Sequence, residues 1–343
     1  MPISQVPFAG ISNPVGFRNA LINGDFSIAQ RGTSFASGAN NDDAYTLDRW
    51  YILSDGNDAI DVTQETSVVP TNQLTAIALD VETTNKKFGI AQIIEQKNCV
   101  GLIGNTVTLS FQAKVSATTK LDNIKCAIVA WSGTADTVTS DIISAWGAEG
   151  TNPTLIANAT YENSPANLNV TTSYAKYVVS AAVDTSSTKN IIVFIWSDVT
   201  DTTAGDFLYI TDVQLEPGSQ ASGFEFLPID VSLGRCQRYF QSIGGVSDAS
   251  ISSGMSNTTS SSVFTIHYKK TMRTTPTHAV NDLKATDNTT YDKTVTGISS
   301  TQANINTSRL FVDTVSGATQ FRPASLLPQT TSSTSRLTLD AEL

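Results

Sequence analysis

Short segments in which apolar and polar residues alternate recur along the first two thirds of the chain. In TVTLSFQAKV (residues 106–115) every second side chain is apolar, which is typical of a strand with one buried face. Residues 174–183 and 207–216 also read as strands, and residues 190–197 (NIIVFIWS) are apolar on both faces. Weaker strands are expected at 45–53, 58–65, 73–81 and 88–96. Because no segment reads as a long amphipathic helix, the pattern predicts an all-β protein with a jelly-roll β-sandwich at 19–227.

The strand pattern is interrupted once, at residues 228–245. Pro228 ends the preceding segment, and Asp230 is placed to cap the N–H groups of a short connecting helix. The helix would carry an apolar stripe made of Leu233, Cys236, Tyr239 and Phe240. Short strands then resume in Ser- and Thr-rich turns, so a second, smaller β domain is expected at 246–343.

Residues 1–18 (MPISQVPFAGISNPVGFR) contain three prolines and no periodic pattern. Such a segment cannot pair regularly in a sheet, so we expect an extended arm. Its apolar side chains favour docking against a partner; they are Ile3, Val6, Phe8 and Ile11.

The net charge of −10 and the pI of about 4.6 argue against a nucleic-acid or anionic membrane partner. The three cysteines, Cys99, Cys126 and Cys236, have no metal-site or redox spacing and are expected to be buried free thiols. The N-terminal ten residues lack the basic region and apolar core of a signal peptide. No apolar run is long enough to cross a bilayer. These features predict synthesis in the cytoplasm without membrane insertion.

The stretch NALINGDFSIAQRGTSF (residues 19–35) contains the strongest turn signal of the chain. Asn23-Gly24 forms this signal because both residues tolerate positive φ, and a strand is expected from Asp25-Phe26 onward. The segment YTLDRW (residues 45–50) follows, with an acid, an arginine and a tryptophan in succession.

Together with ITDVQLEPGSQASGFEFLPID (residues 210–230) and LGRCQRYF (residues 233–240), these segments resemble a module of tail-fibre and other appendage proteins of tailed bacteriophages. MRTTPT (residues 272–277) and the terminal DAEL are similar to the domain that often follows it. The family module is similar to carbohydrate-binding jelly rolls. The resemblance therefore implies a jelly roll whose first and last strands pair.

The resemblance also implies structural roles for residues of the opening segments. Asn19, Asn23, Gly24 and Phe26 would set the opening turn and plug the sandwich. Trp50 would be a core aromatic whose indole N–H is bonded nearby. Arg49 could pair with any of three carboxylates, namely Asp25, Asp48 or Glu216, and so tie the first strand to the last.

Motifs for catalysis are scarce. His267 and His278 are ten residues apart on the chain, and no third metal ligand lies near them in sequence. There is no nucleophile elbow, phosphate-binding glycine loop or zinc-binding helix. Two of the many carboxylates could meet in a glycosidase-like cleft, so an enzyme remains an alternative. No organic cofactor is expected.

A structural calcium ion is a further candidate, because the similar carbohydrate-binding jelly rolls often hold one. Its candidate oxygen ligands are Asp25, Asp48, Asp212 and Glu216. The alternative is that these carboxylates form a salt bridge with Arg49.

Sugars bind against aromatic rings with short polar side chains at the rim. Trp50 and Trp196 are expected in the core. This leaves Trp131 at a strand end, and Trp146 and Tyr161 in loops, as ligand-binding candidates. The alternatives are that these rings cover the sandwich edge or are buried in a subunit contact, or that the site lies in the C-terminal domain near Tyr268 and Tyr291.

The resemblance implies a non-enzymatic virion protein, most simply a tail fibre. It would attach to other virion proteins through residues 1–18, contact host-surface polysaccharide and assemble as a homotrimer. The stripe of the connecting helix would then pack around the trimer axis or within one protomer. A capsid decoration or cement protein is the alternative within the same fold, and a glycan-degrading enzyme is the alternative outside it.

Overall fold

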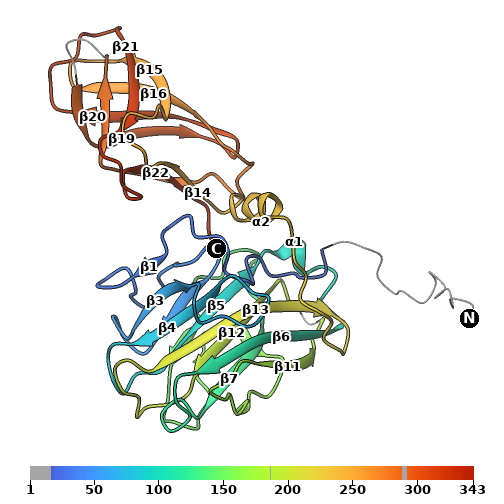
Figure 1. Cartoon of the computed structure of the whole chain (residues 1–343). Helices are drawn as coiled ribbons and strands as arrows, with labels where there is room; N and C mark the ends of the chain where they lie inside the picture. Colours follow the sequence, from blue (N-terminus) through green and yellow to red (C-terminus); the bar gives the residue numbers. More distant parts are fainter. Residues whose placement is uncertain (1–16, 186, 288–291) are drawn as a thin grey trace, which may run out of the picture.

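The computed structural model describes residues 17–185, 187–287 and 292–343. The expected arm therefore lies outside the described residues except for Phe17 and Arg18. The described chain forms two β bodies, with a short helix beside their junction (Figure 1). The all-β expectation is confirmed. Within the described residues, no helix has the length and apolarity needed to cross a membrane.

The N-terminal body is a sandwich of two antiparallel sheets. Strand order in the six-stranded sheet is β1 (Ser34–Phe35), β3 (Ile60–Glu65), β4 (Ala76–Val81), β13 (Phe207–Pro217), β6 (Thr106–Val115) and β11 (Ala175–Ala182). Strand order in the five-stranded sheet is β10 (Ala159–Tyr161), β7 (Ile124–Trp131), β12 (Asn190–Ser197), β5 (Phe88–Ile94) and β2 (Tyr51–Ser54).

The period-two pattern of the sequence explains how these sheets bury their side chains. On β6, Leu109, Phe111 and Ala113 all join the core between the two sheets, as the alternation predicts. On β12, Val193 joins the same core, whereas its neighbours on the chain face the opposite side and join a second apolar cluster. These neighbours are Ile192 and Phe194. The strand is apolar on both faces because both of its faces are covered.

A long excursion between β7 and β11 covers the outer face of the five-stranded sheet. It contains β8 (Ile143–Ala145) and β9 (Thr154–Leu155), which pair with each other. Together with this sheet it encloses the second apolar cluster, which includes Trp131, Trp146 and Trp196. The excursion is thus a third layer on top of the five-stranded sheet. The outer face of the six-stranded sheet is not covered by it.

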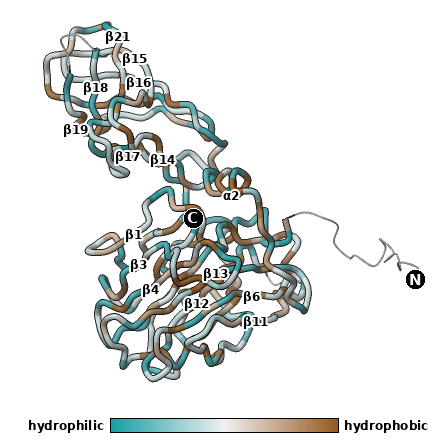
Figure 2. The backbone as a smooth tube through the Cα atoms, in the orientation of Figure 1, coloured by the Kyte–Doolittle hydropathy of each residue, from teal (hydrophilic) through white to brown (hydrophobic). Residues whose placement is uncertain are grey.

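The C-terminal body is built around a closed barrel of small strands. Strand order around it is β15 (Ser252–Ser256), β16 (Ser261–His267), β20 (Thr307–Thr314), β19 (Asp292–Ala303), β18 (Leu283–Thr286) and β21 (Pro323–Pro328). A three-stranded sheet lies at the junction end, in the order β14 (Phe240–Gly244), β22 (Arg336–Asp340) and β17 (Thr277–Asn281). Brown apolar segments run through both bodies in Figure 2, in keeping with their separate apolar clusters.

The connecting helix is shorter than the sequence predicts. The helix α2 spans Ile229–Cys236, and β14 already begins at Phe240, four residues later. Pro228 occupies the N-cap position, and no side chain makes a capping hydrogen bond, so the predicted cap by Asp230 is wrong. The helix α1 (Gln96–Cys99) is a single turn.

The apolar stripe predicted for this helix packs inside the protomer. Cys236 and Tyr239 are buried in a small cluster with Ile22 and Ile28, and Leu233 packs against it. The stripe is therefore covered without a second copy. All three cysteines are free and buried, as expected, and burial raises the pKa of Cys99 and Cys126 to about 12.

The opening segment 19–24 pairs with β13, which confirms that the first and last parts of the sandwich meet. Ala20 N donates to Leu215 O at 2.9 Å, and the Asn19 side chain bonds both Val213 O and Leu215 N. Asn23 adopts a φ of 60°, as its turn requires. A Cβ on Gly24 would lie 2.0 Å from Val213 O, so close backbone approach explains the glycine.

The expected plug of the sandwich is present, but no strand starts at Asp25. Phe26 is fully buried with a φ of 58°, a turn conformation, and its ring centroid lies 5.2 Å from that of Trp50. Trp50 is a buried core residue and donates its indole N–H to Asn23 O at 2.9 Å.

Arg49 pairs with none of the three carboxylates proposed from the sequence. Its side chain is 1% exposed, contacts Glu342 of the C-terminal body and donates to Ile93 O at 2.6 Å. Its guanidinium also lies 3.7 Å from the centroid of the Tyr239 ring. Arg49 has a positive φ of 72°, and its side chain reaches the junction between the two bodies.

Further charged groups join the two bodies around this contact. Arg31 lies 3.0 Å from Asp340 and 3.4 Å from Glu342, and its guanidinium covers the Phe240 ring. On the other side, Arg238 forms two hydrogen bonds with Glu95, at 2.7 and 3.0 Å. The C-terminal segment thus lies against the sandwich, as the position of the C label in Figure 1 shows.

The contacts at the junction predict that the carboxylate of Glu342 contributes strongly to the stability of the fold. Glu342→Ala leaves the buried Arg49 guanidinium without its ion-pair partner, so we expect the free energy of unfolding to fall by roughly 3–5 kcal/mol. Chemical denaturation followed by tryptophan fluorescence measures this loss. Asp201→Ala, in the exposed pair with Lys120, is the matched control and should cost less than about 1 kcal/mol. Equal losses in both variants would contradict the assigned role of Glu342.

Candidate functional site

The uncovered outer face of the six-stranded sheet is organised around an irregularity in β13. The pairing of β13 with β6 shifts between Thr211 and Gln214. Inside this bulge Asp212 has a φ of 56°, a conformation that aspartate tolerates better than most residues. Val213 N donates to Gly24 O at 2.9 Å instead of to a neighbouring strand. The opening segment therefore supplies the hydrogen-bond acceptor for the backbone N–H of Val213 in the bulge.

Asp212 holds two glutamine amides in place. Its Oδ2 accepts from Gln73 Nε2 and from Gln112 Nε2, each at 2.7 Å. The side chain is 6% exposed, and its Oδ1 is buried without a hydrogen-bond partner among the described residues. Burial raises the pKa of Asp212, against the lowering effect of the two amide bonds. Because each amide N–H is directed to Asp212, each glutamine keeps its carbonyl oxygen as an acceptor.

A cavity of about 170 Å³ lies beside this carboxylate. It is lined by Ser110, Phe111, Gln112, Lys176, Asp212, Gly223 and Phe224, of which Phe111 directs its side chain into the core between the sheets. Small-molecule pockets usually enclose about 300–1,000 Å³, so the cavity suits one small ring rather than a longer ligand.

An open groove continues from the same glutamine across the sheet. It is lined by Val69, Pro70, Thr71, Gln112, Lys114, Thr172, Ser173 and Tyr174. The Lys114 ammonium lies 5.9 Å from the Tyr174 ring centroid and 5.5 Å from that of Tyr209. Tyr174 is anchored by its hydroxyl, which donates to Val68 O at 2.8 Å. We call the cavity and this groove together the Gln112 surface.

The Gln112 surface offers the groups that a polyhydroxylated ligand needs. Amide and hydroxyl oxygens accept from sugar hydroxyls, lysines donate to them, and tyrosine rings supply apolar contact. Sequence reasoning missed it because the polar positions of β6, including Gln112 and Lys114, read simply as a solvent-facing side. Of its residues, only Asp212 carries an expectation from the sequence, as a calcium ligand.

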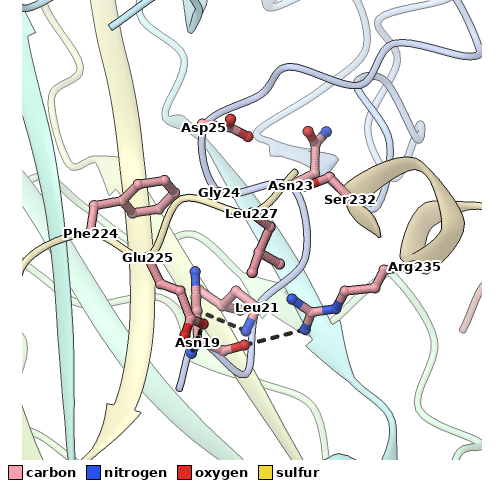
Figure 3. Close-up of a pocket in the computed structure, with 10 residues that line it drawn as sticks. All are labelled: Asn19, Leu21, Asn23, Gly24, Asp25, Phe224, Glu225, Leu227, Ser232 and Arg235. Atoms are coloured by element: carbon pink, nitrogen blue, oxygen red, sulfur yellow. Dashed lines mark hydrogen bonds between the residues drawn. The ribbon is translucent and has the colours of Figure 1, made fainter. Parts of the chain in front are cut away.

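A second cavity, shown in Figure 3, lies where the opening segment meets the chain after β13. Three of its polar residues, Asn19, Glu225 and Arg235, are bonded to one another. Asn19 N donates to Glu225 Oε2 at 3.0 Å, and Arg235 donates to Asn19 O at 3.2 Å. This cavity is a seam between segments that are distant in sequence, and it leaves few polar groups for a ligand.

The aromatic residues that the sequence placed on loops are largely covered. Trp131 ends β7 and Trp146 follows β8 in a loop, as the sequence indicates, but each is 8% exposed and belongs to the apolar cluster beneath the excursion. The cause is that this excursion folds back onto the five-stranded sheet. Tyr161 is half-buried and donates to Pro153 O at 2.8 Å. A ligand-binding role for the three rings stays a prediction.

The four calcium candidates do not converge. Asp48 accepts from the Gln30 side chain, Glu216 accepts from Ser222, and Asp212 accepts from two amides. Asp25 accepts from the Ser27 hydroxyl. Across the described residues, no group of three or more Asp, Glu, His or Cys side chains could hold a metal ion. The proposed calcium set is therefore not assembled, and the carboxylates are occupied by neutral donors instead.

The alternative ligand site in the C-terminal domain, near Tyr268 and Tyr291, differs from the Gln112 surface in its groups. Tyr268 is half-buried, with its hydroxyl 3.3 Å from His278 Nε2, and Tyr291 lies outside the described residues. Burial lowers the pKa of His278 to about 4, so this ring is neutral at physiological pH. His267 is exposed on β16. An open groove on the barrel is lined by Thr265, Gln302, Ala303, Asn304, Thr307, Ser308 and Arg309.

Carboxyl groups with strongly raised pKa values lie away from the Gln112 surface. Burial, together with the nearby charges of Asp42 and Asp141, raises the pKa of Asp43 to about 7. Burial and three neighbouring acids raise the pKa of Asp80 to about 6. A general acid needs such a value, but neither residue lines the cavity or the groove described above.

Comparisons with known proteins give only distant likenesses. No family model matches the chain, and no curated protein matches it. Among solved structures, the enzymatically active domain of tailspike protein 4 from bacteriophage CBA120 is 17% identical with a TM-score of 0.34, covering 59% of this chain and 22% of that one.

Carbohydrate-binding modules are also among the similar structures. A family 4 module is 14% identical with a TM-score of 0.30, covering 57% of this chain and 98% of that one. A family 22 xylan-binding domain of Paenibacillus barcinonensis is 11% identical with a TM-score of 0.31, covering 53% of this chain and 94% of that one. At these scores the likenesses are too distant to assign a ligand or an activity.

The raised pKa of Asp43 predicts a pH-dependent effect on stability. The folded protein holds this proton up to a pH of about 7, whereas the unfolded chain releases it near 3.8, so the contribution of Asp43 to stability is lost as the pH rises from about 4 to 7. Asp43→Asn stays neutral throughout. We expect it to raise the thermal unfolding midpoint at pH 8 and to change it little at pH 4. Asp55→Asn, at an exposed position, controls for the loss of one negative charge. A shift of equal size at both pH values would contradict the prediction.

Proposed function

We propose that this chain is a non-enzymatic structural protein of a tailed-phage virion, a tail fibre or other appendage, that contacts host-surface glycans through the Gln112 surface. The observation that carries the glycan contact is the arrangement of Gln73 and Gln112 on Asp212. A buried carboxylate fixes two amides at an open face, where their carbonyl oxygens are free to accept. The resemblance of residues 19–50 and 210–240 to phage appendage modules supports the virion role.

Attachment to the particle is assigned to residues 1–18. The arm is rich in proline and carries apolar side chains that find no partner within their own short segment. Phe17, the first described residue, is 60% exposed, and the Arg235 guanidinium lies 5.2 Å from its ring centroid. Homotrimeric assembly also belongs to this proposal, with the stripe of α2 excluded as the trimer contact because it is covered within the protomer.

The glycan contact predicts a loss of binding on substitution of two residues. Gln112→Ala removes an amide that lines both the cavity and the groove, and Asp212→Ala removes the oxygen that accepts from both glutamines. We expect each to weaken binding about tenfold, the equivalent of one or two hydrogen bonds. The measurement is retention on an array of purified bacterial surface polysaccharides.

Arg309→Ala, in the groove of the barrel, is the matched control and should bind like the unsubstituted protein. Loss of binding in Arg309→Ala alone would move the glycan site to the C-terminal domain. Failure of the unsubstituted chain to retain any polysaccharide would remove glycan recognition from the proposal.

The attachment role predicts that the arm is dispensable for folding but not for assembly. Deletion of residues 2–16 should leave the melting temperature unchanged, because both β bodies are built from residues beyond it. The truncated chain should be missing from purified particles, as judged by immunoblot. Normal incorporation would exclude the arm as the anchor. Labelling of the full-length chain by electron microscopy then separates a tail appendage from a capsid decoration protein.

A further inference from the structure

Two buried lysines and one aspartate meet beneath the excursion that covers the five-stranded sheet. Asp198 is completely buried, and Lys87 and Lys125 are 1% and 5% exposed. Lys87 contacts Asp198 Oδ1, and Lys125 Nζ lies 2.6 Å from Asp198 Oδ2. Lys125 Nζ also lies 2.9 Å from Asn152 Oδ1 on the excursion. An amine is therefore in contact with both a side-chain amide and a carboxylate.

The two lysines differ in their surroundings. The Lys87 ammonium is directed to three backbone carbonyls of the excursion, those of Ala148 at 2.7 Å, Thr151 at 3.3 Å and Trp146 at 3.4 Å. For Lys125, the acceptors found in the described part of the chain are Asp198 and Asn152 alone. Lys87 is thus surrounded by more acceptors than Lys125.

The two oxygens of Asp198 face different lysines, Oδ1 toward Lys87 and Oδ2 toward Lys125. Of the two amines, Lys125 Nζ is therefore the one that contacts both the carboxylate and the Asn152 amide.

We propose that Lys125 and Asn152 form an intramolecular isopeptide bond, with Asp198 as the proton carrier. The Lys125 amine attacks Cγ of Asn152, and its proton passes to Asp198 Oδ2. Asp198 returns this proton to the amide nitrogen as the Cγ–Nδ2 bond breaks. The products are a secondary amide between the two side chains and one molecule of ammonia, so no oxidant, reductant or other reactant is needed.

The position of Asn152 suits this reaction. Its Nδ2 is directed to Pro165 O at 3.4 Å, which turns the carbonyl side of the amide toward Lys125. Pro153 follows it and has no backbone N–H, so the usual cyclisation of asparagine with the next peptide nitrogen is blocked. The cross-strand partner of Lys125 is Trp196, a fully buried residue whose bulk helps to exclude water.

The bond would join β7 to the excursion by a covalent link. The excursion is also held by the pairing of β10 with β7, by apolar packing and by the carbonyl contacts of Lys87. A cross-link between positions 125 and 152 closes a loop that contains β8 and part of the second apolar cluster. This loop is then constrained even in the unfolded chain.

Intact-mass spectrometry of the purified full-length chain tests the proposal directly. We expect a mass about 17 Da below that of the sequence, corresponding to the loss of one ammonia. Digestion followed by tandem mass spectrometry should yield a branched peptide that joins Lys125 to Asn152. A chain of full sequence mass would overturn the proposal.

Two variants separate this bond from other losses of ammonia. Lys125→Arg keeps a long polar side chain but lacks the nucleophilic amine, and Asn152→Ala lacks the amide. Both should show the full mass expected for their sequences. The same mass deficit in either variant would place the modification elsewhere, for example at Asn23-Gly24, and overturn the assignment. The mass of the unsubstituted chain decides the question even if a variant fails to fold.

Discussion

The close contact between Gly24 and Val213 is the constraint on which the arrangement of the sandwich depends. The absence of a side chain on Gly24 lets the opening segment enter the bulge of β13. Gly24 O accepts a hydrogen bond from Val213 N, which does not pair with a neighbouring strand at the bulge. This contact allows Asp212 to stay in a left-handed conformation. The same turn places Asn23 against the indole of Trp50. A turn near the start of the chain therefore positions both the plug of the core and the polar centre of the outer face.

The features that the sequence predicts well are those set by local alternation or by a turn. The buried face of β6 and the double burial of β12 follow from the pattern of residue types. The pairing of segment 19–24 with β13 is what the resemblance of the opening and closing segments implies. The pattern overestimates the extent of α2 because Tyr239 and Phe240 continue its apolar spacing after the helix has ended. These two residues are buried by packing at the junction, and their spacing matches that of an apolar helix face although they lie outside the helix.

The remaining features depend on contacts between distant parts of the chain. The partner of Arg49 is 293 residues away, so the nearer carboxylates are the reasonable but wrong choice. Trp131 and Trp146 stand beside loop-forming residues, and nothing local indicates that the excursion folds back over them. The Gln112 surface depends on Gln73, Gln112 and Asp212, which three separate segments contribute. Such a site becomes recognisable only after the strands are placed.

The junction between the two bodies has a consequence for the order of folding. The ion pairs of Glu342 join residues 293 and 311 positions apart, so the chain loop that each one closes spans most of the protein. Closing such loops early would cost entropy and gain few contacts. We therefore expect each β body to fold before these contacts form, and until then Arg49 stays hydrated. The docking of the two bodies would be the last step of folding, so the arginine loses its water only in a chain whose two halves are both correctly folded.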